Sequence, residues 1–221
     1  MKKILLSLAA IVIAGCSSAP PTIQEGPDAE VSFDGLHLID NSVFRQAWAD
    51  PDIDFSRYSK FMPGGASFEY RAVRKTQSTR ARSSSSEFYI DENARETLKE
   101  ITSEIFAEEL ANSTRFTVTD VRGQDTIIIR GALHDIVSNV PPERSGRGDV
   151  FLSQVGEITL ILEVVDSMSD EVIFRAVERR ALERSGTAIR ASSVTSRAEA
   201  RRVIRRWATT LREGLDSIPT E

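Results

Sequence analysis

Two stretches in the last third of the chain alternate apolar and polar residues, and this alternation constrains the fold more than any other feature. In 157–164 every second residue is apolar: Ile158, Leu160, Leu162 and Val164. The stretch 172–180 also alternates, and Arg175, Glu178 and Arg179 are predicted to mark its partly solvated faces. Successive side chains of a strand point to opposite faces, so a period of two predicts strands with one buried face. The turn-forming residues DSMSD at 166–170 predict that the two stretches pair as an antiparallel hairpin.

Further strands are predicted on the N-terminal side of this hairpin. Residues 126–137 are rich in β-branched side chains, and a long Pro- and Gly-containing loop joins them to the hairpin. An earlier strand is expected from about 58 to 73, interrupted by the turn-forming Pro63-Gly64-Gly65. The sequence therefore predicts an antiparallel meander of about four to five strands.

Two amphipathic helices are predicted around these strands. Asp91 can cap a helix over 92–112, in which apolar residues recur at helical spacing. They are Ala94, Leu98, Ile101, Ile105 and Leu110. A final helix is predicted to open with a capping box from Ser196 to Glu199. Its buried stripe comprises Ala200, Val203 or Ile204, Trp207, Leu211 and Leu215. The order of elements predicts an α+β fold, with two main helices packed on one face of an antiparallel sheet.

The N-terminus has the pattern of a secretion signal. Met1-Lys2-Lys3 is positively charged, and an apolar run over 4–14 follows, interrupted only by Ser7. A helix of this length would extend about 17 Å, well short of the roughly 30 Å of bilayer hydrocarbon. The segment is therefore predicted to be a cleaved signal peptide rather than a membrane-spanning helix.

The single cysteine, Cys16, follows Ile13, Ala14 and Gly15 at the predicted cleavage site. An aliphatic residue and two small residues before a cysteine resemble the lipobox of bacterial lipoproteins. The resemblance implies cleavage before Cys16, a diacylglycerol on its thiol and an N-acyl chain on its new amine. Ser17 and Ser18 then favour transfer to the outer membrane, with the folded domain facing the periplasm. The alternative is an ordinary signal peptide with an accidental cysteine after it.

Three segments are expected on this basis. Residues 1–15 form the cleaved signal peptide, 16–32 the acylated cysteine with a flexible tether, and 33–221 a single α+β periplasmic domain. The tether is predicted because SSAPPTIQEGPDAEVS contains few apolar groups to bury. Such a segment would reach at most about 50 Å when extended.

Composition excludes several classes of function. The formal net charge of −5 argues against a general nucleic-acid binder, because phosphate binding requires a basic domain. One cysteine cannot form an internal disulfide, and two histidines, His37 and His134, provide little for a zinc site. No nucleophile elbow or phosphate-binding glycine loop is present. We therefore expect neither a catalytic residue nor a metal, and no cofactor beyond the acyl chains on Cys16.

Arginines concentrate toward the C-terminus of this acidic chain. On the final helix they are Arg201, Arg202, Arg205, Arg206 and Arg212, all predicted to lie on its outer side. A solvated helix face is one interpretation. The other is a docking site for an acidic protein, a glycan or an anionic lipid.

Several segments together resemble the DUF3313 family of uncharacterised bacterial lipoproteins. They are the lipobox, DGLHLID (34–40), DFSRYSKF (54–61), the first helix, DTIIIRGALHDI (125–136) and LILEVVDSMSDEVIFRA (160–176). The resemblance implies a lipid-anchored periplasmic domain and brings no established activity.

The sequence thus predicts a non-catalytic binding or accessory module of a cell-envelope assembly, anchored to the outer membrane through its lipid. Its expected partner is an envelope protein or a glycan, and its oligomeric state is left open. The alternative is an envelope hydrolase or a small-ligand-binding protein without a recognisable motif. A membrane-inserted ring or pore is disfavoured, because 66–90 is too charged and serine-rich for an inserting hairpin.

Overall fold

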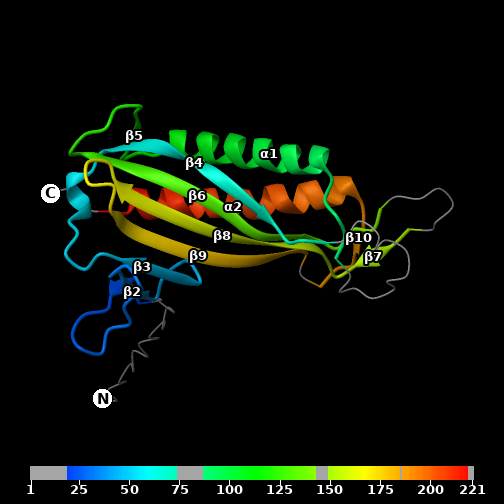
Figure 1. Cartoon of the computed structure of the whole chain (residues 1–221), viewed down its shortest axis with the longest axis horizontal. Coiled ribbons are helices and arrows are strands. Elements are labelled where there is room, and N and C mark those ends of the chain that lie inside the picture. Colours follow the sequence, from blue (N-terminus) through cyan, green and yellow to red (C-terminus); the bar gives the residue numbers. More distant parts are fainter. Residues whose placement is uncertain (1–18, 74–86, 143–148, 185, 219–221) are drawn as a thin grey trace, which may run out of the picture.

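The computed structural model of the chain describes residues 19–73, 87–142, 149–184 and 186–218. Within these residues the chain forms an eight-stranded sheet with two long helices on one face (Figure 1). The predicted α+β class and the placement of both helices on one face are therefore confirmed. The number of strands is larger than the predicted four to five. The additional strands were not predicted because several of them contain only two to four residues, too few for a recognisable alternation.

Strand order in the main sheet is β1-β2-β3-β9-β8-β6-β4-β5. These strands are β1 (Thr22–Ile23), β2 (His37–Asp40), β3 (Gln46–Ala49), β4 (Lys60–Tyr70), β5 (Thr117–Val118), β6 (Thr126–Ser138), β8 (Gln154–Asp166) and β9 (Val172–Glu183). A separate pair joins β7 (Phe151–Leu152) to β10 (Ile189–Arg190). The helices are α1 (Glu92–Ala111), α2 (Ser193–Asp216) and the short 3-10 helix η1 (Phe55–Arg57).

The predicted meander is confirmed for β6, β8 and β9, which pair antiparallel in chain order. The prediction of a fully antiparallel sheet is wrong at β4, which pairs parallel to β6. The reason is the connection between them: α1 crosses from the end of β4 back to the start of β6, and parallel neighbours require such a crossover. The alternation within β4 cannot reveal the direction of its partner.

Pro63-Gly64-Gly65 was expected to interrupt the strand, yet β4 continues through it. The register with β6 shifts between Pro63 and Ala66, which is a bulge. Gly65 adopts a φ of +86°, and a Cβ on Gly64 would lie 2.6 Å from Ile128 Cγ2. The glycines are therefore required by the bulge and by the close approach of β6.

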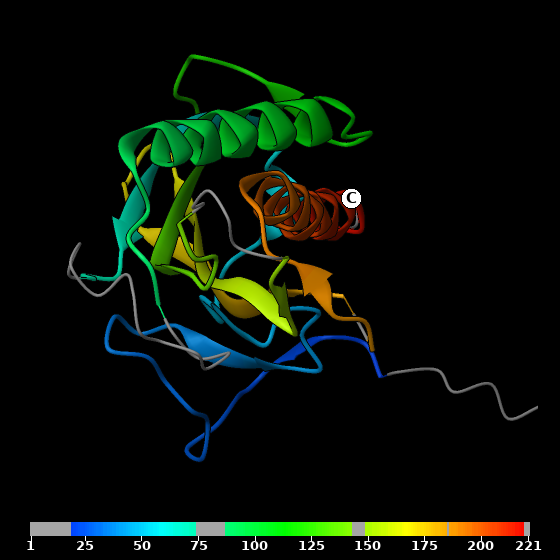
Figure 2. The same cartoon turned by 90° about the vertical axis from the view of Figure 1, so that its right-hand side faces the viewer.

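The core lies between the sheet and the two helices (Figure 2). All four apolar residues of the alternating stretch in β8 are buried in it, as predicted. They pack in one cluster with residues such as Ile105 of α1 and Trp207 of α2. Of the stripe predicted for the first helix, Ala94 is exposed instead, because it lies in the first turn beyond the sheet contact.

The predicted cap is correct for α1 and wrong for α2. Asp91 caps α1 as expected, with its side chain accepting from Ala94 N at 2.8 Å. The capping box from Ser196 to Glu199 is wrong, because α2 begins one turn earlier, where Ser192 Oγ accepts from Thr195 N at 3.1 Å. Glu199 is buried instead and binds two arginines, Arg184 at 2.7 Å and Arg202 at 2.8 Å.

The described part of the predicted tether is attached to the domain. Thr22 and Ile23 form β1 against β2, and the Gln24 side chain donates to Asp40 Oδ1 at 2.8 Å. His37 Nδ1 lies 2.7 Å from the carbonyl oxygen of Gln24. The prediction of a free tether to residue 32 is therefore wrong from Thr22 onward. Pairing with β2 satisfies backbone N–H and C=O groups of this polar segment, and composition alone cannot reveal such pairing.

The turn between β8 and β9 is held by a buried carboxylate. Asp166 Oδ1 accepts from Met168 N at 2.7 Å and Ser169 N at 2.9 Å. Its Oδ2 accepts from Tyr58 OH at 2.7 Å and Arg57 Nη2 at 2.6 Å. Every oxygen of this carboxylate is thus bound, and the cluster fastens η1 to the hairpin.

The protonation of this cluster follows from its contacts. Burial alone would raise the pKa of Asp166, but the hydrogen bonds from Tyr58 and from the turn N–H groups outweigh it and lower that pKa. Burial, together with the neighbouring carboxylate, raises the pKa of Tyr58 to about 12. The cluster is therefore an ionised carboxylate with a neutral phenol beside it at neutral pH.

No helix in the described ranges combines the length and apolar composition needed to cross a bilayer.

Candidate functional site

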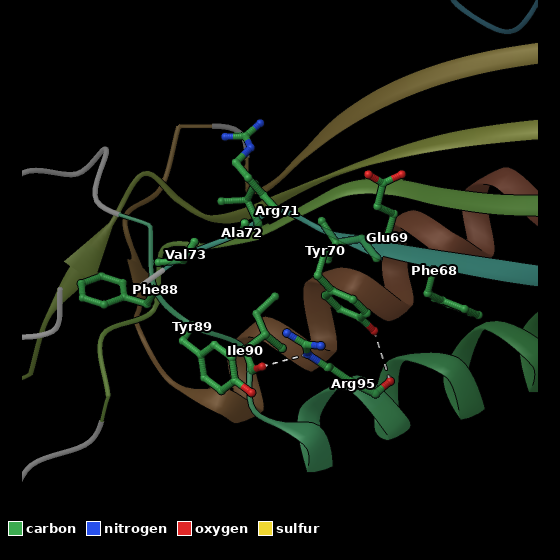
Figure 3. Close-up of a pocket in the computed structure, with 12 residues that line it drawn as sticks. Phe68, Glu69, Tyr70, Arg71, Ala72, Val73, Phe88, Tyr89, Ile90 and Arg95 are labelled. Atoms are coloured by element: carbon green, nitrogen blue, oxygen red, sulfur yellow. Dashed lines mark hydrogen bonds between the residues drawn. The ribbon is translucent and has the colours of Figure 1, made fainter. Parts of the chain in front are cut away.

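A pocket of about 660 Å³ lies where the end of β4, residues 87–91 and the first turn of α1 meet (Figure 3). It is lined by Phe68, Glu69, Tyr70, Arg71, Ala72, Val73, Phe88, Tyr89, Ile90, Arg95, Ile136 and Val137. Its walls are thus mainly aromatic and aliphatic, with two arginines and one carboxylate among them.

Local structure explains how these side chains meet. The period of two in β4 turns Phe68 and Tyr70 toward the helix side, where both pack against the core. Glu69 turns to the other face and lies 2.8 Å from His134 Nδ1 on β6. Because Asp91 caps α1, Arg95 falls one turn into the helix, and its side chain extends back toward the helix start.

Arg95 is the central polar group of the pocket. Its guanidinium carbon lies 4.5 Å from the ring centroid of Tyr70 and 5.3 Å from that of Tyr89, both within cation–π range. Its Nε donates to the carbonyl oxygen of Ile90 at 3.0 Å, as Figure 3 shows. No carboxylate in the described part of the chain forms an ion pair with it.

The second arginine of the pocket is already neutralised. Arg71 Nε donates to Asp135 Oδ1 at 2.6 Å, and its other nitrogens bind Asp135 and Glu87. The hydrogen bond from Arg71 holds the pKa of Asp135 below its usual value, so this carboxylate is ionised at neutral pH. Among the residues lining the pocket, the cation without a carboxylate partner is therefore Arg95.

Tyr70 adds a neutral wall with one polar atom. Burial raises the pKa of its phenol to about 12, and its OH donates to the carbonyl oxygen of Arg95 at 3.4 Å. A phenol with this pKa is protonated at neutral pH and is a weak nucleophile. The arrangement is suited to holding an anionic group beside aromatic rings rather than to proton transfer.

The predicted docking arginines lie on α2, and most of them have partners within the chain. Arg201 binds Glu104 at 2.9 Å, and Arg205 binds Glu108 at 3.0 Å and Glu109 at 3.2 Å, which ties α2 to α1. Arg212 lies within 3.6 Å of Glu109 and 3.3 Å of Asp216, and Arg202 pairs with Glu199. Arg201, Arg205 and Arg212 thus link α2 to α1, whereas Arg202 is paired within α2.

Arg206 differs from the other four. It is exposed and forms no ion pair within the described residues. Docking through this face therefore stays a prediction, and the part of it that is open to a partner centres on Arg206.

Of the remaining predicted positions, some lie outside the described residues and the others lie on strands. Cys16 and the lipobox residues Ile13, Ala14 and Gly15 lie outside the described residues. His37 and His134 lie on strands, each with one polar partner as given above. In the described ranges, no group of three or more metal-binding side chains comes together.

Sequence reasoning missed the pocket. Residues 58–73 are predicted only as a strand, 66–90 only as too charged for a membrane-inserting hairpin, and Arg95 has no predicted role. One sequence signal was available: two aromatic residues, Phe88 and Tyr89, stand directly before the cap of α1. That signal indicates a covered helix start, but it does not identify Tyr70 as the third ring.

Several solved structures resemble this chain in part. A PelC dodecamer from Paraburkholderia phytofirmans shares 12% identity over 71% of this chain and 89% of its own, with a TM-score of 0.32. A DUF330 protein from Xanthomonas campestris shares 13% identity over 70% and 82%, with a TM-score of 0.37. A neuraminyllactose-binding hemagglutinin homolog from Helicobacter pylori shares 12% over 75% and 91%, with a TM-score of 0.39.

Of the two sequence comparisons, one finds a match and the other does not. No curated protein matches the chain. The family model described as "Protein of unknown function (DUF3313)" matches residues 40–211, from the last residue of β2 to Leu211 near the end of α2. That match confirms the resemblance inferred from the sequence motifs, and the chain belongs to the DUF3313 family.

Proposed function

We propose that this protein is a lipid-anchored, non-catalytic binding module of the bacterial cell envelope, and that the pocket beside α1 is its binding site. In this proposal Cys16 carries the acyl chains, and the domain faces the periplasm from the outer membrane. The observation that carries the proposal is the Arg95 guanidinium, which lies in an aromatic pocket and has no carboxylate partner among the residues that the structure describes. Partly buried charges in proteins are normally paired, so this one is suited to a partner from outside the chain.

The chemistry of the lining supports binding rather than catalysis. A hydrolase would need a nucleophile and a base in hydrogen-bond contact. The hydroxyl groups of the lining belong to Tyr70 and Tyr89, and the pKa of Tyr70 is raised to about 12. The lining carboxylate, Glu69, is already engaged with His134.

The size of the pocket favours a small ligand or the end of a chain. Its volume of about 660 Å³ lies in the middle of the range typical of small-molecule sites, roughly 300–1,000 Å³. This observation supports the small-ligand-binding alternative that the sequence left open, and it is compatible with a lipid anchor.

The position of β1 supports a pocket that is held away from the lipid. Thr22 follows Cys16 by six residues, a separation of at most about 22 Å. The anchor would therefore keep the β1 side of the sheet near the bilayer. The pocket lies at β4, six strand positions from β1, or about 29 Å across the sheet. A ligand in the periplasm would reach it there.

The test uses a photoreactive amino acid placed in living cells at Tyr89, on the pocket rim. The same amino acid at Val121 is the matched control, since Val121 is 66% exposed but lies at the other end of β4. We expect a defined adduct from position 89 that is lost when Arg95→Gln or Cys16→Ser is added. Equal adducts from both positions, or an adduct that is unchanged by Arg95→Gln, would show that the pocket is not the binding site.

The anchor is tested separately, by labelling cells with palmitate and separating their membranes. The wild-type chain is expected to carry the label and to appear in the outer-membrane fraction. Cys16→Ser is expected to lose the label. Label on the Cys16→Ser variant would refute acylation at this residue.

A further inference from the structure

We propose that the ligand of this pocket carries a single carboxylate next to a flat ring, with the carboxylate on Arg95 and the ring against the tyrosines. The inference rests on the proposed function, and it specifies the chemistry that this site recognises. Three observations carry it: a second arginine–tyrosine stack in the same chain, the charges around the pocket, and the composition of its walls.

The first observation is the stack formed by Arg57 and Tyr58. There the guanidinium carbon lies 4.6 Å from the ring centroid, and the Asp166 carboxylate lies 2.6 Å from the guanidinium. The stack of Arg95 on Tyr70 reproduces the first distance at 4.5 Å. No carboxylate within the described ranges pairs with Arg95 in this second stack. The Arg57 stack thus shows how a carboxylate binds a guanidinium that lies on a tyrosine ring. There the Tyr58 hydroxyl also donates to the carboxylate, whereas the Tyr70 hydroxyl donates to the carbonyl oxygen of Arg95.

The second observation is the charge of the surroundings. Arg71 is neutralised by Asp135 and Glu87, so it offers no further positive charge. Glu69 also lines the pocket and adds a negative charge. A ligand with two negative charges, such as a phosphate monoester, would find a single uncompensated cation. A carboxylate matches that cation in charge, and its two oxygens match the planar fork of a guanidinium.

The third observation is the wall around Arg95. Phe68, Tyr70 and Tyr89 present ring surfaces, and Ile90 and Ile136 add aliphatic contacts. A flat ring can stack on such surfaces in offset or edge-to-face geometry and bury apolar area at the same time. The position of the rings on either side of the guanidinium places the ligand's ring directly next to its charged group.

The experiment measures binding of three probes that differ only in the polar group: 2-naphthoate, 2-naphthamide and 2-naphthyl phosphate. The full chain is purified in lipid nanodiscs, and isothermal titration calorimetry is performed with empty nanodiscs as the reference. We expect 2-naphthoate to bind at least tenfold more tightly than either of the other probes. Arg95→Gln is expected to lose at least tenfold in affinity for 2-naphthoate and to bind 2-naphthamide as the wild type does.

Arg206→Gln is the matched control, because it removes the same charge from an exposed site without an ion pair in the described residues. Its affinity for 2-naphthoate is expected to equal that of the wild type. Thermal unfolding of each variant verifies that the domain is folded. Arg95→Lys, which keeps the charge but loses the planar fork, is expected to retain an intermediate affinity.

Three outcomes would overturn the proposal. Equal affinities for 2-naphthoate and 2-naphthamide would show that the pocket binds ligands but does not recognise a carboxylate. Tighter binding of 2-naphthyl phosphate than of 2-naphthoate would show that the site prefers a doubly charged ligand to a singly charged one. Absence of binding by all three probes to folded wild type would reject this ligand class, while the cross-linking experiment at Tyr89 would still decide whether the pocket binds a partner.

Discussion

The chain stacks an arginine on a tyrosine at both ends of β4, and the two stacks are built differently. At the first end Arg57 and Tyr58 share the buried carboxylate of Asp166, which also binds the turn between β8 and β9. At the second end Arg95 lies between Tyr70 and Tyr89, and no carboxylate of the described residues reaches it. The same pair of side chains therefore serves two purposes.

The difference lies in whether the polar groups find partners inside the chain. A buried carboxylate with all its hydrogen bonds made holds separate segments together. Removal of any one partner therefore lowers the free energy of unfolding of the protein substantially. A cation that is held in place but not paired contributes little to the fold and is available to a ligand. The first stack is thus a structural lock and the second the proposed binding site, and the two can be distinguished by mutation.

The largest expected effect is on the lock. Asp166→Ala removes four hydrogen-bond acceptor contacts and leaves the buried Tyr58 hydroxyl without its partner. We expect the free energy of unfolding to fall by about 3 kcal/mol, measured by denaturant titration. Asp170→Asn is the control in the same turn. It preserves a residue type that tolerates the φ of 60° found there, and its expected effect is below about 0.5 kcal/mol. An Asp166→Ala variant as stable as this control would contradict the lock.

A second pair of variants compares the two phenols directly. Tyr58→Phe removes a hydroxyl that donates to Asp166 at 2.7 Å, and a loss of about 1 kcal/mol in unfolding free energy is expected. Tyr70→Phe removes a hydroxyl whose acceptor lies 3.4 Å away, so a loss below about 0.5 kcal/mol is expected. Equal losses for the two variants would remove the distinction between lock and pocket.

The pH dependence of stability sharpens the comparison further. The pKa of Asp166 in the folded chain is lowered from its ordinary value of 3.8. Its contribution is therefore complete above that value and is lost as the pH falls below it through the folded-state pKa. In acid titrations of unfolding free energy, Asp166→Asn is expected to show a shallower decline than wild type in this range. Arg95→Gln is expected to keep the wild-type decline, and a shallower one would connect the pocket to acid stability.

The smallest expected effects concern the arginines of α2, which show the same contrast on the surface. Arg205→Gln breaks pairs to Glu108 and Glu109 on α1, and a loss of about 0.5 kcal/mol is expected for a pair of this exposure. Arg206→Gln breaks no pair in the described residues, and no change is expected by thermal or chemical unfolding. A larger loss for Arg206→Gln than for Arg205→Gln would show that the ion pairs do not stabilise the helix pair.

Local patterns in the sequence predicted a large part of the fold. The alternation in β8 placed that strand and its buried face correctly, and helical spacing located α1 and α2. The position of β9 was also predicted, but Glu178, expected on a partly solvated face, is buried. The errors occurred where a partner distant in the chain decides the structure. Examples are the parallel pairing of β4 with β6 and the attachment of β1 to β2.

The candidate site was accessible to sequence reasoning only in part. The aromatic residues at 88 and 89 are visible before the cap of α1, but the pocket also requires Tyr70, which lies 25 residues before Arg95. Two further arginines nearby in the chain, Arg57 and Arg71, look equivalent to Arg95 in the sequence. Their carboxylate partners, Asp166 and Asp135, come from 109 and 64 residues away.

By itself the sequence determined the α+β class, the hairpin, the two helices and the membership in one family, because periodicity and capping depend on neighbours in the chain. Only the tertiary structure decided which of the two pocket arginines is neutralised and which has no carboxylate partner in the described part of the chain. Ion pairing depends on distances of a few ångströms between side chains that the sequence places far apart. The proposed binding site at Arg95 therefore depends on the folded chain and could not be read from the sequence.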